Sequence, residues 1–270
     1  MPEHPREQPE ELNFEHKKTR FFSNLGLRTR KAMHVHQEQG LLDKTDSKRE
    51  WGNVTEHCLV EIARVQEFAD LLKLPPDIKD DLTMAAAAHD ALKKKDLRLI
   101  RERVSPWQGM VEADHMTEQA LRQAGFSERV IRLVDSIALE PLPKIETMLD
   151  KKELSDEEIA SLVQHYVDDY TINNEWARPK TIVEGQPAQN DFDRRMDKNE
   201  ANPNYQALNQ EGREHFKGET AYEAQRRVGH LVENFLTRLI NERQGLTLEP
   251  SDLPEHVDAI IKKKIEGTEL

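Results

Sequence analysis

Apolar residues recur at steps of three and four along much of this 270-residue chain, which is the spacing of one face of an α-helix. In the segment 54–72, this stripe consists of Val54, Cys58, Ile62, Val65, Ala69 and Leu72. Pro75 and Pro76 end the segment because proline interrupts a helix interior, and Asp77 opens a second helix that runs to 92. The pattern therefore predicts two consecutive helices in the first half of the chain.

The same spacing continues to the C-terminus. The further helices are expected over 93–105 after a short loop, then 108–124, 127–139, 155–171, 213–243 and 254–265. Ser155 followed by Glu158 forms a capping-box pattern at the start of one of them. Residues 173–210 are instead rich in Asn, Pro, Gln and charged residues, which predicts a long loop with room for short helices only. No segment alternates as a strand does, so the predicted fold class is all-α.

These patterns divide the chain into three parts. Residues 1–45 form an N-terminal arm, expected to be partly disordered because its first part, up to about residue 15, is rich in Pro and Glu. Residues 46–175 form the main helical domain, and residues 176–270 add the long loop and a C-terminal helical extension that packs on the core. An apolar stripe in that extension suits either packing within the chain or a homodimer; it consists of Leu231, Phe235, Leu239 and Ile240.

Charge and cysteine content narrow the class of partner. The formal net charge of −12 repels phosphate backbones at long range, which argues against general nucleic-acid binding but allows a local basic site for a small phosphorylated molecule. The single cysteine, Cys58, cannot form an intrachain disulfide. No apolar run reaches the roughly 18 residues of a membrane span, and the N-terminus lacks an apolar signal-peptide core. We therefore expect a cytoplasmic protein.

Histidines and acids occur at unusual places in three of the predicted helices. His57 lies in the first helix, His89 and Asp90 directly follow an alanine run, and Asp168 follows the partly apolar stretch "LVQHYV". A buried histidine or aspartate is costly unless it is paired or binds a metal. This mixed nitrogen and oxygen set suits Mn, Fe, Co, Ni, Zn or Mg. With eleven histidines in the chain, ordinary packing and a metal site both remain open at this stage.

The order His57, then His89–Asp90, then Asp168, set on a helical core, resembles the HD-domain superfamily of metal-dependent phosphohydrolases, whose pattern is H…HD…D. The resemblance covers roughly half of the chain. It implies an HD-like helical bundle in which these four residues hold one divalent metal ion. In the family, the last ligand often follows a tyrosine and a small residue, which favours Asp168 over Asp169.

The resemblance also assigns a role to a lysine. Many members read HD-x-G-K, and this chain reads His89-Asp-Ala-Leu-Lys93, so Lys93 matches the lysine while Leu92 replaces the glycine. Lys93 is thereby expected to contact the substrate phosphate and stabilise its charge. The ordinary alternative is a solvated helix end.

Three further residues are candidates for the site on the same basis. Glu112 and His115 follow the HD pair in the region where some members place a second-metal ligand, and they are candidate acid–base groups beside the metal. The paired histidines that those members use further along are missing, which favours one metal over two. Arg178 lies in a basic stretch, 178–195, that reads either as a lid over bound substrate or as a linker.

Three functions fit these observations. The first is a metal-dependent phosphohydrolase acting on a nucleotide or a related phosphoester, as the resemblance implies. The second is a catalytically silent HD-fold module that binds a nucleotide or regulates a partner. The third is a structural helical protein whose histidines meet by chance.

Overall fold

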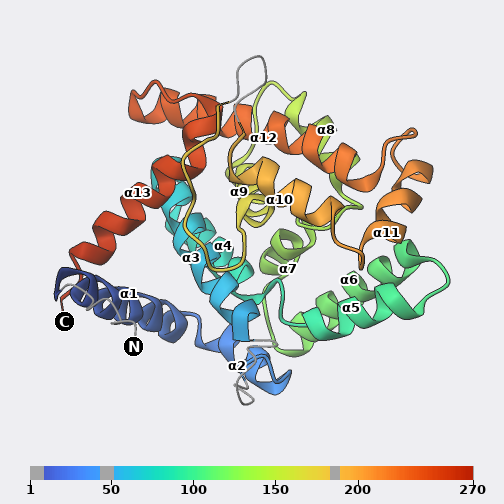
Figure 1. Ribbon diagram of the computed structural model, residues 1–270, viewed down its shortest axis with the longest axis horizontal. Helices are drawn as coiled ribbons and strands as arrows, with labels where there is room; N and C mark the ends of the chain where they lie inside the picture. Colours follow the sequence, from blue (N-terminus) through green and yellow to red (C-terminus); the bar gives the residue numbers. More distant parts are fainter. Residues whose placement is uncertain (1–8, 43–51, 183–188, 270) are drawn as a thin grey trace, which may run out of the picture.

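The computed structural model describes residues 9–42, 52–182 and 189–269. Within these ranges it contains thirteen α-helices, two 3-10 turns and two isolated β-bridges, but no β-strand (Figure 1). The predicted all-α class is therefore confirmed. Among the described helices, none is both long and apolar enough to cross a membrane.

The helices vary from six to 24 residues in length. In chain order they are α1 (Pro9–Arg28), α2 (Arg30–Glu38), α3 (Gly52–Leu71), α4 (Pro76–Ala88), α5 (Lys93–Glu102), α6 (Pro106–Gln123), α7 (Glu128–Asp135), α8 (Leu142–Leu149), α9 (Asp156–Tyr170), α10 (Asp191–Glu200), α11 (Gln206–Glu211), α12 (Ala221–Gln244) and α13 (Leu253–Glu266). The predicted capping box of Ser155 and Glu158 starts α9. The low-periodicity region contains the two short helices α10 and α11.

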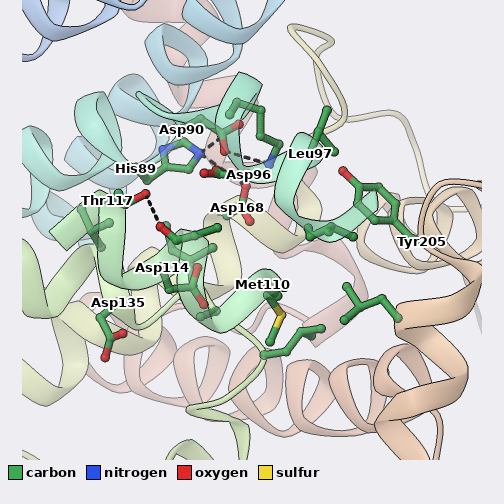
Figure 2. A pocket seen from close by; sticks show the side chains of 18 of the residues that line it. His89, Asp90, Asp96, Leu97, Met110, Asp114, Thr117, Asp135, Asp168 and Tyr205 are labelled. Carbon is green, nitrogen blue, oxygen red and sulfur yellow. Dashed lines mark hydrogen bonds and ion pairs between the residues drawn. The ribbon is translucent and has the colours of Figure 1, made fainter. Parts of the chain in front are cut away.

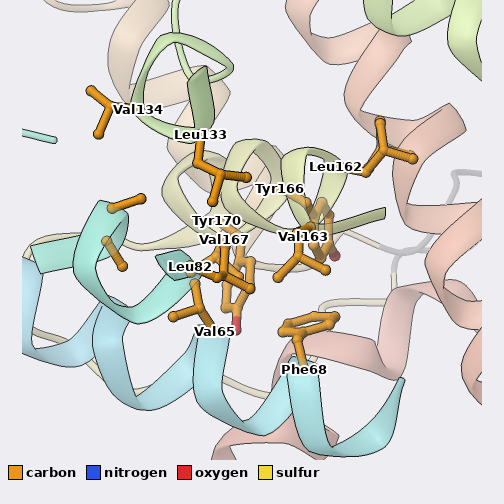
Figure 3. Close-up of a cluster of buried hydrophobic side chains, with 14 of the residues drawn as sticks. Val65, Phe68, Leu82, Leu133, Val134, Leu162, Val163, Tyr166, Val167 and Tyr170 are labelled. Atoms are coloured by element: carbon orange, nitrogen blue, oxygen red, sulfur yellow. The ribbon is translucent and has the colours of Figure 1, made fainter. Parts of the chain in front are cut away.

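Helix α9 lies at the centre of the fold. It packs against α3, α4, α7, α10 and α12, and ten of its fifteen residues are buried. Phe68 of α3 meets Tyr166 of α9 edge to face, with ring centroids 6.1 Å apart, and Val65 of α3, Leu82 of α4 and Val167 of α9 belong to the same buried cluster (Figure 3). A helix surrounded by other helices is apolar on most of its faces, so any ionisable residue on α9 needs a partner.

Helix α1 corrects the expectation for the N-terminal arm. Residues 9–15 were expected to be disordered but begin a 20-residue helix, and the fixed φ of proline is compatible with the Pro9 position at its start. Residues 1–8 lie outside the described residues. Helix α1 packs on α3 and α13, and Lys17 Nζ donates to Glu266 O at 2.5 Å. The two ends of the described chain therefore lie close together (Figure 1).

Helix α12 starts later than the sequence suggested and buries a broader face than the expected stripe. Thr220 caps its start with a capping box, and the preceding residues form a tight turn in which Gly218 has a φ of +95°. Of the stripe, Ile240 is fully buried and Phe235 and Leu239 pack against the core, whereas Leu231 is 43% exposed. The buried face continues through further apolar residues, namely Val228, Val232 and Leu236. The stripe therefore contributes to packing within the chain.

A histidine between two carboxylates joins α10 to α12. His230 Nε2 lies 3.1 Å from Asp193 Oδ1, and His230 Nδ1 lies 3.3 Å from Glu233 Oε2. The hydrogen bonds to Asp193 and Glu233 raise the pKa of His230 from 6.5 to about 9. The charged imidazolium therefore stabilises the contact between these two helices.

The raised pKa of His230 makes one part of the stability depend on pH. The contribution is fully present below about pH 6.5 and is lost as the pH rises through about 9. Solvent screening limits it to about 1 kcal/mol or less. Chemical denaturation of wild type and His230→Gln across this range should show a difference in unfolding free energy that shrinks at high pH. A difference that stays constant from pH 6 to about pH 10 would contradict this account.

Helices α5 and α6 form a hairpin with a close crossing. A Cβ atom added at Gly109 of α6 would lie 2.5 Å from the Leu99 carbonyl oxygen of α5, and backbone atoms cannot move aside as a flexible side chain can. Gly26 of α1 offers a contrast, because its nearest neighbour would be Leu59 Cδ2 at 3.8 Å.

We therefore expect opposite effects from the same substitution at these two glycines. Gly109→Ala should destabilise the protein by about 1–3 kcal/mol, as overpacking does. Gly26→Ala should stabilise it by up to about 1 kcal/mol through helix propensity. Urea unfolding of both variants measures this, and equal effects would show that α5 and α6 do not cross as closely as described.

Candidate metal centre

Helix α3 carries a polar stripe inside the core. His57, Glu61 and Arg64 follow one another at steps of four and three, so they share one helix face. Their exposed fractions are 5%, 0% and 1%. Because buried charge is costly without compensation, this face must meet partners from other helices.

Two other helices deliver those partners at their C-terminal ends. Helix α4 ends at Ala88, and His89 caps it by donating its backbone N–H to Ala85 O. Residues Ala85–Ala88 are fully buried, and their short side chains let this end of α4 lie deep in the core. Asp168 lies in the last turn of α9. The local structure thus places an imidazole and a carboxylate opposite the stripe on α3.

Four side chains bring ligand atoms into one small volume. One atom each from His57, Glu61, His89 and Asp168 lies within 4.8 Å of the others. His57 Nε2 lies 2.8 Å from Glu61 Oε1 and 3.3 Å from Asp168 Oδ1. His89 Nε2 lies 3.6 Å from Asp168 Oδ1. Such spacings suit the edges of a coordination shell with metal–ligand bonds of about 2.0–2.2 Å.

The hydrogen bonds of the two histidines leave one nitrogen of each facing this group. His57 Nδ1 donates to Asn173 O at 2.9 Å, and His89 Nδ1 donates to Ala86 O at 2.9 Å. A backbone carbonyl on the far nitrogen is the usual way in which a metal-binding histidine is oriented. His89 Nε2 and both carboxylate oxygens of Glu61 are buried without a hydrogen-bond partner of normal geometry.

These unsatisfied atoms make the donor set suitable for a metal. Buried polar atoms without a partner are rare and costly in folded proteins. A divalent cation would satisfy the two nitrogens and two carboxylates together. The residues present therefore fit one divalent ion, and the mixed nitrogen and oxygen ligands leave Mn, Fe, Co, Ni and Zn as well as Mg open.

The ionisable side chains of the group shift one another's pKa values. Burial lowers the pKa of His57, but the carboxylates of Glu61 and Asp168 outweigh burial and raise it to about 10. Burial also acts to raise the pKa of Asp168, yet the hydrogen bond to His57 and the charges of His89 and Arg195 hold it well below its ordinary value. Asp168 is therefore an ionised carboxylate inside the protein. Burial raises the pKa of Glu61, so this carboxylate gains most from a nearby cation.

A clamp behind the group fixes the carbonyl that orients His57. Asn173 has a φ of +52°, a left-handed backbone that turns its carbonyl towards His57. Arg64 holds this segment in place by donating to Thr171 Oγ1 at 2.8 Å, and it also pairs with Asp258 of α13 at 2.6 Å. The C-terminal helix therefore helps to position a candidate ligand that lies about 200 residues earlier in the chain.

Asp90 lies beside the four-residue group but is not part of it. Its Oδ1 accepts a hydrogen bond from Lys93 Nζ at 2.8 Å, and its Oδ2 lies 3.7 Å from His89 Nε2. Burial acts to raise the pKa of Asp90, whereas the charges of Lys93 and His89 lower it overall. The predicted role of Asp90 as a ligand stays a prediction, while Glu61 provides the second carboxylate of the close group.

A cavity of about 190 Å³ opens beside the group. His89, Asp90 and Asp168 line one wall, and Lys93 and Arg195 supply positive charge (Figure 2). Other walls come from α5, α6, α7 and the helices α10 to α12. A small molecule bound at the first of these walls would touch two residues of the candidate metal centre, His89 and Asp168.

The structure turns Glu112 and His115 away from this cavity. Helix α6 faces the cavity with Asp114 and Thr117, whereas Glu112 is ion-paired to Arg103 at 2.6 Å on the outer surface. The two pairs are offset by two positions, which is about 200° around a helix, so they face opposite sides of α6. The structure therefore places Glu112 and His115 outside this cavity, and an acid–base role for them stays a prediction.

Arg178 is also placed outside the cavity. Its side chain is 55% exposed and pairs with Glu175 at 2.5 Å. The basic stretch 178–195 is not a simple loop, because α10 starts at Asp191 and carries Arg195 into the cavity wall. Residues 183–188 lie outside the described residues, and so does any closure that would depend on them.

Sequence reasoning missed one residue of this site and left another undecided. Glu61 was missed, although it lies four residues after His57, a spacing that puts both side chains on one helix face. Arg195 belongs to the basic stretch 178–195, which was expected either to close over the site or to act as a linker. Because this region lacks helical periodicity, nothing in the sequence indicated the direction of the Arg195 side chain.

Loss of one carboxylate should weaken metal binding strongly. We expect Mn²⁺ titration of the full-length chain to show one tight site and Glu61→Gln to weaken it by more than about 10-fold. The matched control is Glu67→Gln, because Glu67 is buried on the same helix but pairs with Lys264. Equal affinities for Glu61→Gln and Glu67→Gln would contradict the assignment of Glu61.

Comparison with known proteins adds no assignment to this geometry. Neither protein-family models, nor curated proteins, nor solved structures gave a match to this chain. The chain is therefore described by its own structure, as an all-α protein with a buried group of two histidines and two carboxylates that could hold a metal ion.

Proposed function

We propose that this protein is a metal-dependent phosphohydrolase that acts on a nucleotide or a related phosphoester. The observation that carries the proposal is the close group of His57, Glu61, His89 and Asp168, which lies at the wall of a cavity that also contains Lys93 and Arg195. A candidate metal centre and two cations at one cavity are the parts that phosphoryl chemistry requires.

The four residues would hold the metal, and the two histidines are already oriented by backbone carbonyls. A divalent ion bound there would polarise a phosphoryl oxygen and lower the pKa of a bound water. The sequence resemblance to HD-domain phosphohydrolases supports the same assignment. Asp90 would hold Lys93 in place through their 2.8 Å hydrogen bond.

The two cations would bind the phosphate. Burial acts to lower the pKa of Lys93, but Asp90 outweighs it and raises that pKa well above its ordinary value, so Lys93 stays charged. In the described part of the chain, Arg195 has no hydrogen bond or ion pair to another residue. A planar guanidinium that lines a cavity without a protein partner is free to take a phosphate through two hydrogen bonds.

One observation favours a second candidate function. Asp90 is engaged by Lys93 rather than by the close group, which is compatible with a catalytically silent module that binds a nucleotide or regulates a partner. In that case Lys93 and Arg195 would bind phosphate without turnover.

Phosphate release distinguishes the two functions. We expect the full-length chain to release phosphate from p-nitrophenyl phosphate and from nucleoside monophosphates when Mn²⁺, Co²⁺, Ni²⁺ or Mg²⁺ is added. Arg195→Ala should lower kcat/KM by about 100-fold, as loss of one charge-stabilising group does. The control is Lys94→Ala, because Lys94 is the neighbour of Lys93 but donates to Gly40 O at 2.8 Å.

Three outcomes distinguish the hydrolase from the catalytically silent module. Metal-dependent turnover that Arg195→Ala lowers and Lys94→Ala does not would support the hydrolase. Phosphate-ester binding without turnover on any substrate would favour the silent module. A chain that binds neither metal nor phosphate would contradict both.

A further inference from the structure

The cavity has a second end with a different chemistry. Its walls also carry the carboxylates of Asp96, Asp114 and Asp135. In Figure 2, Asp114 and Asp135 lie on the part of the cavity away from Asp168, whereas Asp96 lies near Asp90 and Asp168. The two cations of the cavity, Lys93 and Arg195, therefore lie near the candidate metal centre, and its far wall is acidic.

Several acceptor oxygens that line this cavity lack a partner among the described residues. Asp96 Oδ1 and Asp114 Oδ2 are shielded from solvent and accept no hydrogen bond from the described residues. Gln225 also lines the cavity, is 6% exposed, and leaves its Oε1 without a donor. Its Nε2 donates to Asp169 Oδ1 at 2.5 Å, which fixes Oε1 as the free end of the amide.

These acceptors are not arranged for a second metal ion. Among the described residues, the group of His57, Glu61, His89 and Asp168 is the one set of potential ligands close enough to share an ion. Asp96, Asp114 and Asp135 line the same cavity without forming such a set. Acceptors that are spread along a wall match a molecule with several separated hydrogen-bond donors better than they match a point charge.

We infer that this wall binds the organic part of the phosphoester and selects a group rich in hydroxyl or amino donors that carries no negative charge of its own. The inference rests on the proposed function, because it takes the phosphate to lie at Lys93 and Arg195. It names the substrate class more narrowly: a phosphomonoester of a polyhydroxylated or amino-bearing group.

Charge complementarity supports this choice. A phosphomonoester with a donor-rich organic part is negative at its phosphate and neutral or positive elsewhere. Its phosphate would lie at Lys93 and Arg195, and its donors would face the acidic wall. Burial and repulsion from Asp96 and Asp135 raise the pKa of Asp114 to about 8, so this wall disfavours any further negative charge. Apolar residues that also line the cavity, such as Leu97 and Met110, would contact the ring of the ligand.

A matched set of ligands tests the inference on the intact Mn²⁺-loaded chain. The probes are phosphonate analogues, which cannot be hydrolysed, of glucosamine 6-phosphate, glucose 6-phosphate, cyclohexylmethyl phosphate and 6-phosphogluconate. Their organic parts carry an ammonium with hydroxyls, hydroxyls alone, no donor, and hydroxyls with a carboxylate. Calorimetry gives the dissociation constant of each.

We expect both donor-bearing sugar analogues to bind at least about 10-fold more tightly than the cyclohexyl analogue, and the carboxylate analogue to bind more weakly than the glucose analogue. Equal dissociation constants for all four would overturn the inference. An advantage of the amino sugar over glucose would assign the wall to cationic donors, and equality of those two would assign it to hydroxyls.

A pair of variants tests whether the preference for donor-bearing ligands depends on this wall. Asp114→Asn should reduce the preference for donors by about 10-fold or remove it. Asp80→Asn, the same substitution at an exposed position of α4, should leave it unchanged, and equal profiles for the two variants would count against the inference. If Asp114→Asn does not fold, the comparison of the four ligands on wild type still decides.

Failure of this inference and failure of the proposed function give different experimental results. Metal-dependent release of phosphate from p-nitrophenyl phosphate without any preference among the four analogues would leave the proposed function standing and overturn this inference. A preference among the analogues without any release of phosphate would support this inference and contradict the proposed hydrolase activity.

Discussion

The structure depends on one constraint, which is the placement of ionisable side chains in the middle of an apolar core. His57, Glu61 and Arg64 lie on a helix that packs against five others, and each would be costly there without compensation. Arg64 is satisfied by Asp258, Thr171 and a backbone carbonyl. His57 is partnered by Asp168, Glu61 and the Asn173 carbonyl, whereas neither carboxylate oxygen of Glu61 makes a hydrogen bond of normal geometry.

Several other elements of the fold position the side chains of that group. The alanine run of α4 brings His89 into the core, and the end of α9 brings Asp168 to the same place. Helix α13 reaches back through Asp258 to hold the segment whose Asn173 carbonyl orients His57. Elements from both ends of the sequence thus converge on one centre, and for that reason the C-terminal helices belong to the site and not only to the core.

The sequence predicted those features that depend on local periodicity. The helices were expected because their apolar spacing is a local property, and the order of His57, His89 and Asp168 indicated which residues would meet. Glu61 was missed because it is one of four acidic residues in its helix, and none of them stands out until a partner is known. Glu112 and His115 were expected on the cavity side because spacing alone does not fix the rotation of α6 about its axis. The direction of Arg195 depends on long-range packing of α10 against α9 and α12, which no local pattern encodes.

The central claim is that His57, Glu61, His89 and Asp168 form one metal centre. Anomalous diffraction from a crystal of the full-length chain grown with Mn²⁺ tests this claim most directly. The account predicts one strong peak bonded to Nε2 of both histidines and to oxygens of Glu61 and Asp168, and the same map shows whether Asp90 joins them. Mn²⁺ found only at surface carboxylates, with none at this buried group, would contradict the account.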